Sequence, residues 1–255
     1  MGFRLRKYYL DATTADGHAV IAYWASLRWG ALRLRYAALD WFDASGVTRT
    51  TSSFGAPPPE ESDDGVTWIA DALGVSGQWR RRAEPITKDL FRRGDRSVRW
   101  SCRAPAATVA LRVGDRTLEG AGYVECLDCT IEPWRLPIDV LHWGRVAEGS
   151  RTATWIAWEG SHPLQLLVVD GREVAAREIS ASRVAWGDES IALEPVRTLR
   201  DARLDHGALR GIPRLLRVAP LRLLAAHETK WLSRAAGAWC IHEVVRFGER
   251  GGAER

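Results

Sequence analysis

The fold class follows from the stretch Val98-Arg99-Trp100-Ser101-Cys102, which leads through Val109-Ala110-Leu111-Arg112-Val113 to the pair Gly114-Asp115. Apolar and polar residues alternate in both runs, and Leu32-Arg33-Leu34-Arg35-Tyr36 repeats the pattern. Successive side chains of a strand point to opposite faces of its sheet. The alternation therefore predicts strands with one buried face and one face toward water.

Short turn signals separate the alternating runs. A glycine beside an aspartate or a serine supplies the positive-φ geometry that tight hairpin turns need. Such pairs lie between β-rich runs at Asp16-Gly17, Ser45-Gly46, Gly94-Asp95, Gly114-Asp115, Asp170-Gly171 and Gly187-Asp188. Strands joined at these short intervals indicate successive antiparallel hairpins, so we predict an all-β protein.

Small residues near the midpoint predict a division of the chain. The run Leu118-Glu119-Gly120-Ala121-Gly122 separates two hairpin-rich halves of similar length. A chain of 255 residues suffices for one large β domain or two small ones. We predict one β module over residues 1–120 and a second over residues 121–255.

The segment from Leu209 to Trp231 departs from the alternation. It interleaves leucines with arginines, and Pro213 and Pro220 would interrupt a helix there. We predict a short amphipathic cover that packs over a sheet or a barrel mouth. Peripheral contact with a membrane surface is the alternative, because a basic amphipathic segment also binds lipid.

Composition favours a soluble protein without a nucleic-acid partner. The net charge is only +4, and acidic residues lie close to the runs Arg80-Arg81-Arg82 and Arg92-Arg93, so we expect no nucleic-acid partner. Neither a signal peptide nor a stretch of about 20 apolar residues, as a membrane span requires, is evident. We expect a cytoplasmic protein whose four cysteines are reduced. The sequence gives no prediction of the oligomeric state.

Motifs for metals and nucleotide cofactors are missing. Cys126 and Cys129 are three residues apart, so on a strand they point to opposite faces, and no second pair follows at zinc-site spacing. The phosphate-binding patterns G-x-G-x-x-G and the P-loop are absent, as is the G-x-S-x-G nucleophile elbow. We therefore predict a protein that uses no cofactor and no metal.

One carboxylate stands among aromatic and apolar residues, in the run Gly122-Tyr123-Val124-Glu125. A carboxylate in such a place is either stabilised by a partner or takes part in proton transfer. In the first interpretation Arg135 or Arg145 pairs with Glu125 as a structural ion pair. In the second, Glu125 is a catalytic acid, and Tyr123 and His142 orient it or relay its protons. A hydrogen-bonded core residue is the simpler interpretation of His142.

Further candidates lie in the second half. The run His227-Glu228-Thr229-Lys230-Trp231 places Glu228 and Lys230 on one strand face, where they could complete an active site; a solvated edge strand with an ion pair explains them equally. Glu243 lies among apolar residues of the last expected strand, which suggests a buried acid paired with an arginine. The candidate substrate-binding residues are Trp134, Trp143, Arg135, Arg145, Trp155, Trp231 and Glu228.

The order of these features resembles a known family. A β-rich first half with Val98-Arg99-Trp100 leads into Gly120-Ala121-Gly122-Tyr123-Val124-Glu125, with Trp-Gly-Arg at 143–145 downstream. This resembles the hydroxyneurosporene synthase (carotenoid hydratase) and AttH-like superfamily of double lipocalins. The resemblance implies two antiparallel barrels and an apolar substrate near the second. It also places Glu125 at the position of an acid that protonates a double bond, while Cys126 and Leu127 stand where the hydratases have His and Asn.

Three functions remain compatible with the sequence. The first is cofactor-independent acid–base chemistry, namely hydration, cyclisation or isomerisation, on an isoprenoid-like or polyketide-like molecule in a Trp-lined cavity. The second is a non-catalytic binding protein for lipids or other apolar small molecules. The third is a structural β protein with a filled interior.

Overall fold

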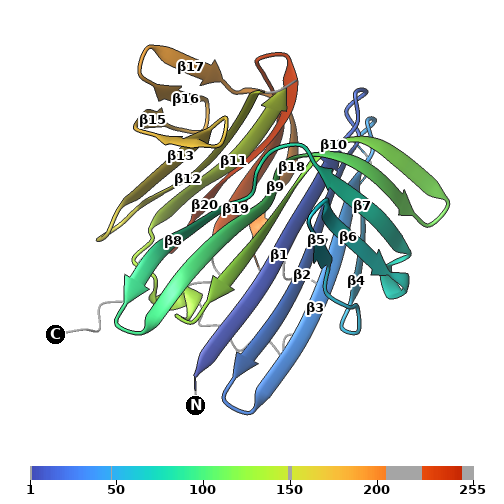
Figure 1. The fold of residues 1–255 in the computed structure, drawn as a ribbon, viewed down its shortest axis with the longest axis horizontal. Coiled ribbons are helices and arrows are strands. Elements are labelled where there is room, and N and C mark those ends of the chain that lie inside the picture. The colour runs from blue at the N-terminus through green and yellow to red at the C-terminus, as the bar shows by residue number, and fades with distance from the viewer. Residues whose placement is uncertain (1, 47, 149–150, 205–225, 249–255) are drawn as a thin grey trace. The chain divides into compact units, whose positions relative to one another are not determined.

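The computed structural model describes residues 2–46, 48–148, 151–204 and 226–248, and these residues form strands and two short 3-10 helices. The predicted all-β class is confirmed (Figure 1). The predicted cover segment lies largely in residues 205–225, outside the described residues. No helix of the described chain is long and apolar enough to span a membrane.

The first sheet has ten strands in the order β4-β3-β2-β1-β10-β9-β7-β6-β5, with β8 paired to β9. Its members are β1 (Phe3–Thr13), β2 (Ala19–Trp29), β3 (Leu32–Phe42), β4 (Thr48–Ser53), β5 (Glu60–Ser62), β6 (Gly65–Ala70), β7 (Val75–Arg81), β8 (Ile86–Arg93), β9 (Arg96–Val113) and β10 (Arg116–Cys129). The 3-10 helix η1 (Asp71–Leu73) joins β6 to β7. The two alternating runs that predicted strands around Val98 and Val109 both belong to β9.

The later strands form two further sheets. A seven-stranded sheet has the order β14-β13-β12-β11-β20-β19-β18, and a three-stranded sheet the order β15-β16-β17. Their bounds are β11 (Val140–Glu148), β12 (Arg151–Glu159), β13 (Leu164–Val169), β14 (Arg172–Val174), β15 (Ala176–Ile179), β16 (Arg183–Trp186), β17 (Glu189–Ala192), β18 (Glu194–Arg203), β19 (His227–Ala235) and β20 (Ala238–Arg246). The 3-10 helix η2 (Pro133–Arg135) precedes β11.

The chain divides into two compact units. Unit 1 contains the chain up to Glu132 together with Ala147–Ala153 and Val169–Arg172. Unit 2 contains Pro133–Val146, Thr154–Val168 and the described chain from Glu173 onward. The division predicted after Gly120 falls within β10, and unit 1 continues beyond it.

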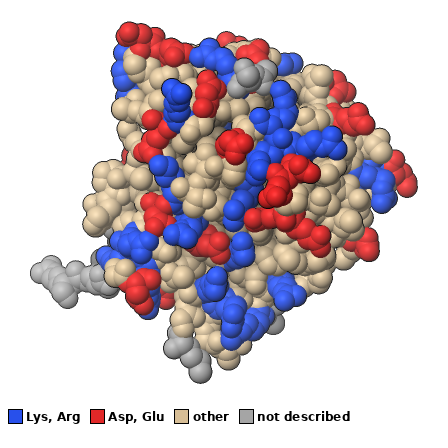
Figure 2. All heavy atoms as spheres, viewed as in Figure 1, with Lys and Arg blue, Asp and Glu red and all other residues tan. Residues whose placement is uncertain are grey.

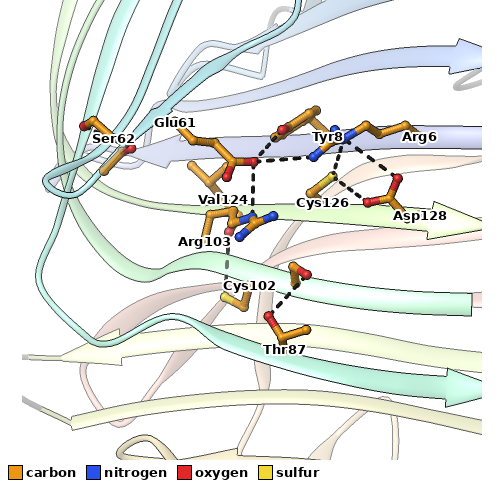
Figure 3. Close-up of polar contacts among 12 residues, drawn as sticks. Arg6, Tyr8, Glu61, Ser62, Thr87, Cys102, Arg103, Val124, Cys126 and Asp128 are labelled. Atoms are coloured by element: carbon orange, nitrogen blue, oxygen red, sulfur yellow. Dashed lines mark hydrogen bonds and ion pairs between the residues drawn. The ribbon is translucent and has the colours of Figure 1, made fainter.

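Tryptophan and small aliphatic residues fill the interior of unit 1. Trp24, Trp41, Trp68 and Trp79 belong to one packed core cluster, together with residues such as Leu10, Leu39 and Val124. The first sheet curls around this core and brings β5, at one end of the strand order, close to β1. There the hydroxyl of Tyr8 in β1 donates a hydrogen bond to the carboxylate of Glu61 in β5 (Figure 3). In the core of unit 1, rigid indole rings therefore pack among a larger number of aliphatic side chains.

The acidic, proline-rich loop between β4 and β5 is partly a core element. The pattern of Gly55 to Gly65 predicts an exposed, mobile loop. Instead Ala56 is 2% exposed, and the indole Nε1 atoms of Trp24 and Trp68 donate to the carbonyls of Ala56 and Pro57 at 3.0 and 2.9 Å. The expected exposure is wrong for Ala56, because two buried indole donors need acceptors that the loop backbone supplies, whereas Pro57 is exposed as expected.

Two glycines near the midpoint allow close packing between neighbouring strands. A Cβ atom at Gly120 would lie 2.1 Å from the carbonyl oxygen of Thr13, and one at Gly122 would lie 2.3 Å from that of Asp11. Trp79 also donates from Nε1 to the Asp11 carbonyl at 2.7 Å. These glycines let β1 and β10 approach closely around the Trp79 ring.

Gly122→Ala is expected to lower the free energy of unfolding by about 1–3 kcal/mol, because the new methyl group would overpack this contact. Urea unfolding of Gly122→Ala and of Gly55→Ala measures the effect. Gly55 is the control, because a Cβ atom there meets nothing within 4 Å. Equal loss of stability in both variants would contradict the proposed role of Gly122.

Charges of both signs are interspersed over most of the face shown in Figure 2. A group of basic side chains gathers at the lower edge of that view, toward the ends of β1, β2 and β3 in Figure 1. The four cysteines are free and buried.

Candidate functional site

Glu125 lies on β10, on the sheet face opposite the packed core of unit 1. Its carboxylate Oε2 accepts hydrogen bonds from Trp100 Nε1 at 2.6 Å and from Tyr123 Oη at 2.8 Å. The side chain is partly buried, whereas Trp100 and Tyr123 are fully buried. Two rigid aromatic donors thus fix the orientation of this carboxyl group.

Neighbouring strands bring further aromatic and acidic residues to the same face. Tyr9 of β1 lies directly opposite Glu125, and Tyr23 of β2 lies directly opposite Tyr9. Asp11 lies opposite Tyr123 and is fully buried. We call this set of residues the Glu125 face, and it comprises Tyr9, Asp11, Tyr23, Trp100, Tyr123 and Glu125.

Aromatic contacts hold the Glu125 face together. The Tyr9 ring packs edge-on against Tyr23 and Tyr123, with centroids 5.5 and 6.2 Å away. Burial, with added contributions from Cys102 and Glu125, raises the pKa of Tyr123 well above its usual value. Tyr123 therefore keeps its proton at neutral pH and remains a hydrogen-bond donor to Glu125.

Cys102 lies directly opposite Glu125 on β9. Burial raises the pKa of its thiol well above the usual value, and the charges of Glu125 and Asp11 act in the same direction. This thiol stays protonated, so it does not supply a thiolate nucleophile at neutral pH.

Sequence analysis missed Asp11, Tyr9, Tyr23 and Trp100 as neighbours of Glu125. In β1, Asp11 shares its face with Tyr9 and Lys7, the same kind of pattern that singled out Glu125. The alternation test could therefore have identified Asp11. The grouping of these residues also required the strand register, which pairs β1 with β10 across more than 100 residues and places Trp100 of β9 near Glu125.

The candidates of unit 2 include a buried ion cluster. Lys230 is 1% exposed and Glu228 is 3% exposed, and Lys230 Nζ lies 3.3 Å from Glu228 Oε1 and in contact with Glu243. Arg200 binds Glu228 with an Nη1–Oε2 distance of 2.7 Å. The Trp143 ring lies 5.6 Å from Lys230 Nζ.

The predicted common face of Glu228 and Lys230 is confirmed, but the expected solvated edge strand is wrong. β19 lies between β18 and β20, so both of its edges are paired, and the charges of Glu228 and Lys230 are buried. Glu243 is also near a cation, although Lys230 takes the place of the expected arginine. Buried charges of this kind persist only when they are paired.

The two carboxyl groups of the cluster have pKa values shifted in opposite directions. Burial raises the pKa of Glu228, but Lys230 and Arg200 more than offset burial, and the pKa lies well below the usual value. Burial, with the charge of Glu228 adding to it, raises the pKa of Glu243. The cluster is thus held by ion pairs centred on an ionised Glu228.

A second polar pair occupies the opposite face of the same strands. Ser233 Oγ and His242 Nε2 are 2.8 Å apart, both residues are buried, and Trp231 stacks on His242 with centroids 5.0 Å apart. Trp155 packs on the same face, where its ring occupies the space that a Cβ atom of Gly144 would need. Burial lowers the pKa of His242 to about 4, with His142 acting in the same direction.

Stability is expected to fall by about 3 kcal/mol between pH 6.5 and pH 4 on account of His242. In this window the unfolded chain binds a proton at His242 and the folded chain does not, so stability is present above pH 6.5 and is lost as the pH falls. Urea unfolding of the wild type and of His242→Gln at several pH values measures how much His242 contributes to the pH dependence of the free energy of unfolding. An unchanged pH slope in the variant would contradict it.

The remaining candidates are dispersed. His142 points away from Leu141 and Trp143, as predicted, and burial lowers its pKa although Glu159, 4.0 Å away, opposes this effect. Arg145 is buried and donates from Nη1 to the carbonyl of Trp239 at 3.4 Å.

Trp134 and Arg135 lie in η2, partly buried and exposed respectively. Trp155 is buried and Trp231 is partly buried. Glu125 and Tyr123 belong to unit 1, whereas His142 and all of the candidate substrate-binding residues belong to unit 2.

No protein-family model matches the sequence, and no curated protein matches it. Solved structures do match over nearly the whole chain. A protein of Nitrosomonas europaea called AttH has a TM-score of 0.58 at 10% identity, over 96% of this chain and 92% of its own. Kievitone hydratase from Nectria haematococca has a TM-score of 0.54 at 9% identity, over 96% and 89%.

A third match is CghA, with a TM-score of 0.54 at 11% identity over 97% of this chain and 90% of its own. CghA has also been solved with Sch210972. At such low identity these matches establish a shared fold.

Proposed function

The chain has the lipocalin-like fold of the AttH-like and carotenoid hydratase superfamily, and on this premise we propose that it is a cofactor-independent enzyme that moves protons on an apolar small molecule. The observation that carries the proposal is the Glu125 carboxyl group, held by Trp100 and Tyr123 on a face lined by tyrosine rings. One of the proteins with this fold is a hydratase, which supports the same class of chemistry.

The chemistry would begin with the transfer of a proton from Glu125 to one carbon of an alkene. The π electrons of the double bond form the new C–H bond, and the neighbouring carbon becomes positively charged. Rings such as Tyr9 and Tyr23 can stabilise this charge through their π faces. Tyr123 and Trp100 donate to the carboxylate that remains, which stabilises its negative charge.

The carbocation can then react in three ways. Addition of water followed by return of a proton to Glu125 gives hydration. Loss of a proton from an adjacent carbon gives an isomer. Attack by a second double bond of the same molecule, followed by proton loss, gives a ring. Asp11, buried next to Tyr123, is the second carboxylate of the face and a candidate acceptor for the departing proton.

Isotope labelling tests this proposal and separates the reactions. Purified protein is incubated with an extract of apolar metabolites in D2O or in H2(18)O, and products are compared by mass spectrometry with those of heat-denatured protein. The proposal predicts deuterium on carbon in a new product, and 18O as well if the reaction is hydration. A bound compound that gains neither label would indicate a carrier instead.

A further inference from the structure

Arginines are arranged in rows at one end of the first sheet. Arg4, Arg28 and Arg33 lie directly opposite one another on β1, β2 and β3. Arg35 lies opposite Ser26 in the next row, and Ser26 lies opposite Arg6. The following row, with Tyr8 opposite Trp24, already belongs to the packed core of unit 1. The arginine rows therefore continue the core face outward to the end of the hairpins.

Only one of these arginines has acidic neighbours among the described residues. Arg6 lies between Glu61 and Asp128, with N–O distances of 3.9 and 3.8 Å, as Figure 3 shows. Arg33 donates to the carbonyls of Gly30 and Leu32 in its own hairpin. Within the described ranges, Arg4, Arg28 and Arg35 form no ion pair, and all three are exposed. Like charges directly opposite each other in a sheet are destabilising, so this arrangement is costly without a counter-charge.

A groove with an apolar wall lies at the same place. Its volume is about 530 Å3, and it is lined by Ser26, Leu27, Arg28, Arg33, Leu34, Arg35 and Phe54. Phe54 is 40% exposed and is held in position by Tyr36, with ring centroids 5.6 Å apart. We call these residues the arginine groove. It lies in unit 1, where Ser26, Arg28, Arg33 and Arg35 are on the sheet face opposite the Glu125 face, while Leu27 and Leu34 alternate with them.

We propose that the arginine groove binds the phosphate head of an amphiphilic small molecule, with the apolar tail lying along Phe54. Three guanidinium groups line the groove, and each offers a planar pair of donors that matches two oxygens of a phosphate. A phosphate also carries more negative charge than a single carboxylate and offers more acceptor oxygens, so it matches three guanidinium groups better. The volume falls within the range of ordinary ligand sites.

Isothermal titration calorimetry with n-hexyl phosphate, in a buffer of low salt free of phosphate, tests the proposal. Inorganic phosphate probes the head alone, hexanol probes the tail alone, and vesicles of phosphatidylglycerol probe a lipid surface. The wild type is expected to bind hexyl phosphate more tightly than either half-molecule. Affinity should fall as salt is added, because the head is bound by charge.

Matched double variants locate the site. Arg28→Gln/Arg35→Gln is expected to weaken hexyl phosphate binding by roughly tenfold for each arginine. Arg80→Gln/Arg93→Gln removes the same charge from exposed positions elsewhere and should leave affinity within about twofold. Phe54→Ser should reduce the affinity for hexyl phosphate toward that for inorganic phosphate.

Folding of the groove variant is checked by its melting temperature, which should equal or exceed that of the wild type because repulsion is relieved. Equal loss of affinity in both double variants would overturn the proposal, since charge alone would then explain binding. Absence of hexyl phosphate binding at millimolar concentration, or binding to vesicles only, would also overturn it.

Discussion

Glu125→Gln is expected to lower the rate of proton transfer to substrate by about 10²- to 10⁴-fold, the usual contribution of a positioned acid or base. The amide has the size of the acid, and its oxygen can still accept the hydrogen bonds from Trp100 and Tyr123. It has no acidic proton to give. Binding of the substrate should therefore change little while turnover is lost. The rate of deuterium incorporation into product in D2O measures the effect.

Glu119→Gln is the matched control, because Glu119 is an exposed carboxylate on the same strand. It should retain the rate of the wild type. If Glu125→Gln turned over as fast as this control, Glu125 would not be the proton donor. If Glu125→Gln were unfolded, the loss would be structural, which urea unfolding of both variants would reveal.

Lys230→Met is expected to lower the free energy of unfolding by about 3–5 kcal/mol, the largest change in stability that we predict. Lys230 is 1% exposed and lies against both Glu228 and Glu243. Its removal leaves two carboxyl groups in a buried cluster where, among the described residues, Arg200 is the remaining cation paired with Glu228. Urea unfolding midpoints measure the loss.

The double variant Lys230→Met/Glu243→Met separates lost pairing from lost packing. It replaces both partners by apolar side chains, so it should be less destabilised than the sum of the two single variants. A Lys230→Met variant within about 1 kcal/mol of the wild type would show that the ion cluster contributes little.

The local pattern of the sequence predicted most of the strands, because alternation and turn glycines act over a few residues. Each of the six turn pairs falls between consecutive strands, and the glycine of each has positive φ, as at Gly17 and Gly114. The last expected strand, around His242 and Glu243, corresponds to β20.

Contacts between distant strands could not be predicted in the same way. Gly120 and Gly122 suggested a boundary in the sequence, yet they allow β1 to pack on β10, a contact that depends on the carbonyls of Thr13 and Asp11. The composition of the loop predicted exposure at Ala56, but its backbone accepts hydrogen bonds from two indoles of other strands, which the local sequence does not reveal.

The candidate site also depends on contacts between strands that the local sequence does not reveal. Glu125 and Tyr123 could be singled out from β10 alone, but Asp11, Tyr9 and Trp100 join them only through the register of β1 and β9. The burial of Glu228 and Lys230 likewise depends on β18, which pairs with β19 and supplies Arg200.

The most direct test of the proposed activity is mass spectrometry of the compound retained and released by the wild type and by Glu125→Gln after incubation with apolar metabolites in D2O. We predict a deuterated product with the wild type and the unlabelled precursor with the variant. The same deuterated product from both proteins would contradict a role for Glu125 in proton transfer. The same unlabelled compound on both would contradict catalysis and make the protein a carrier.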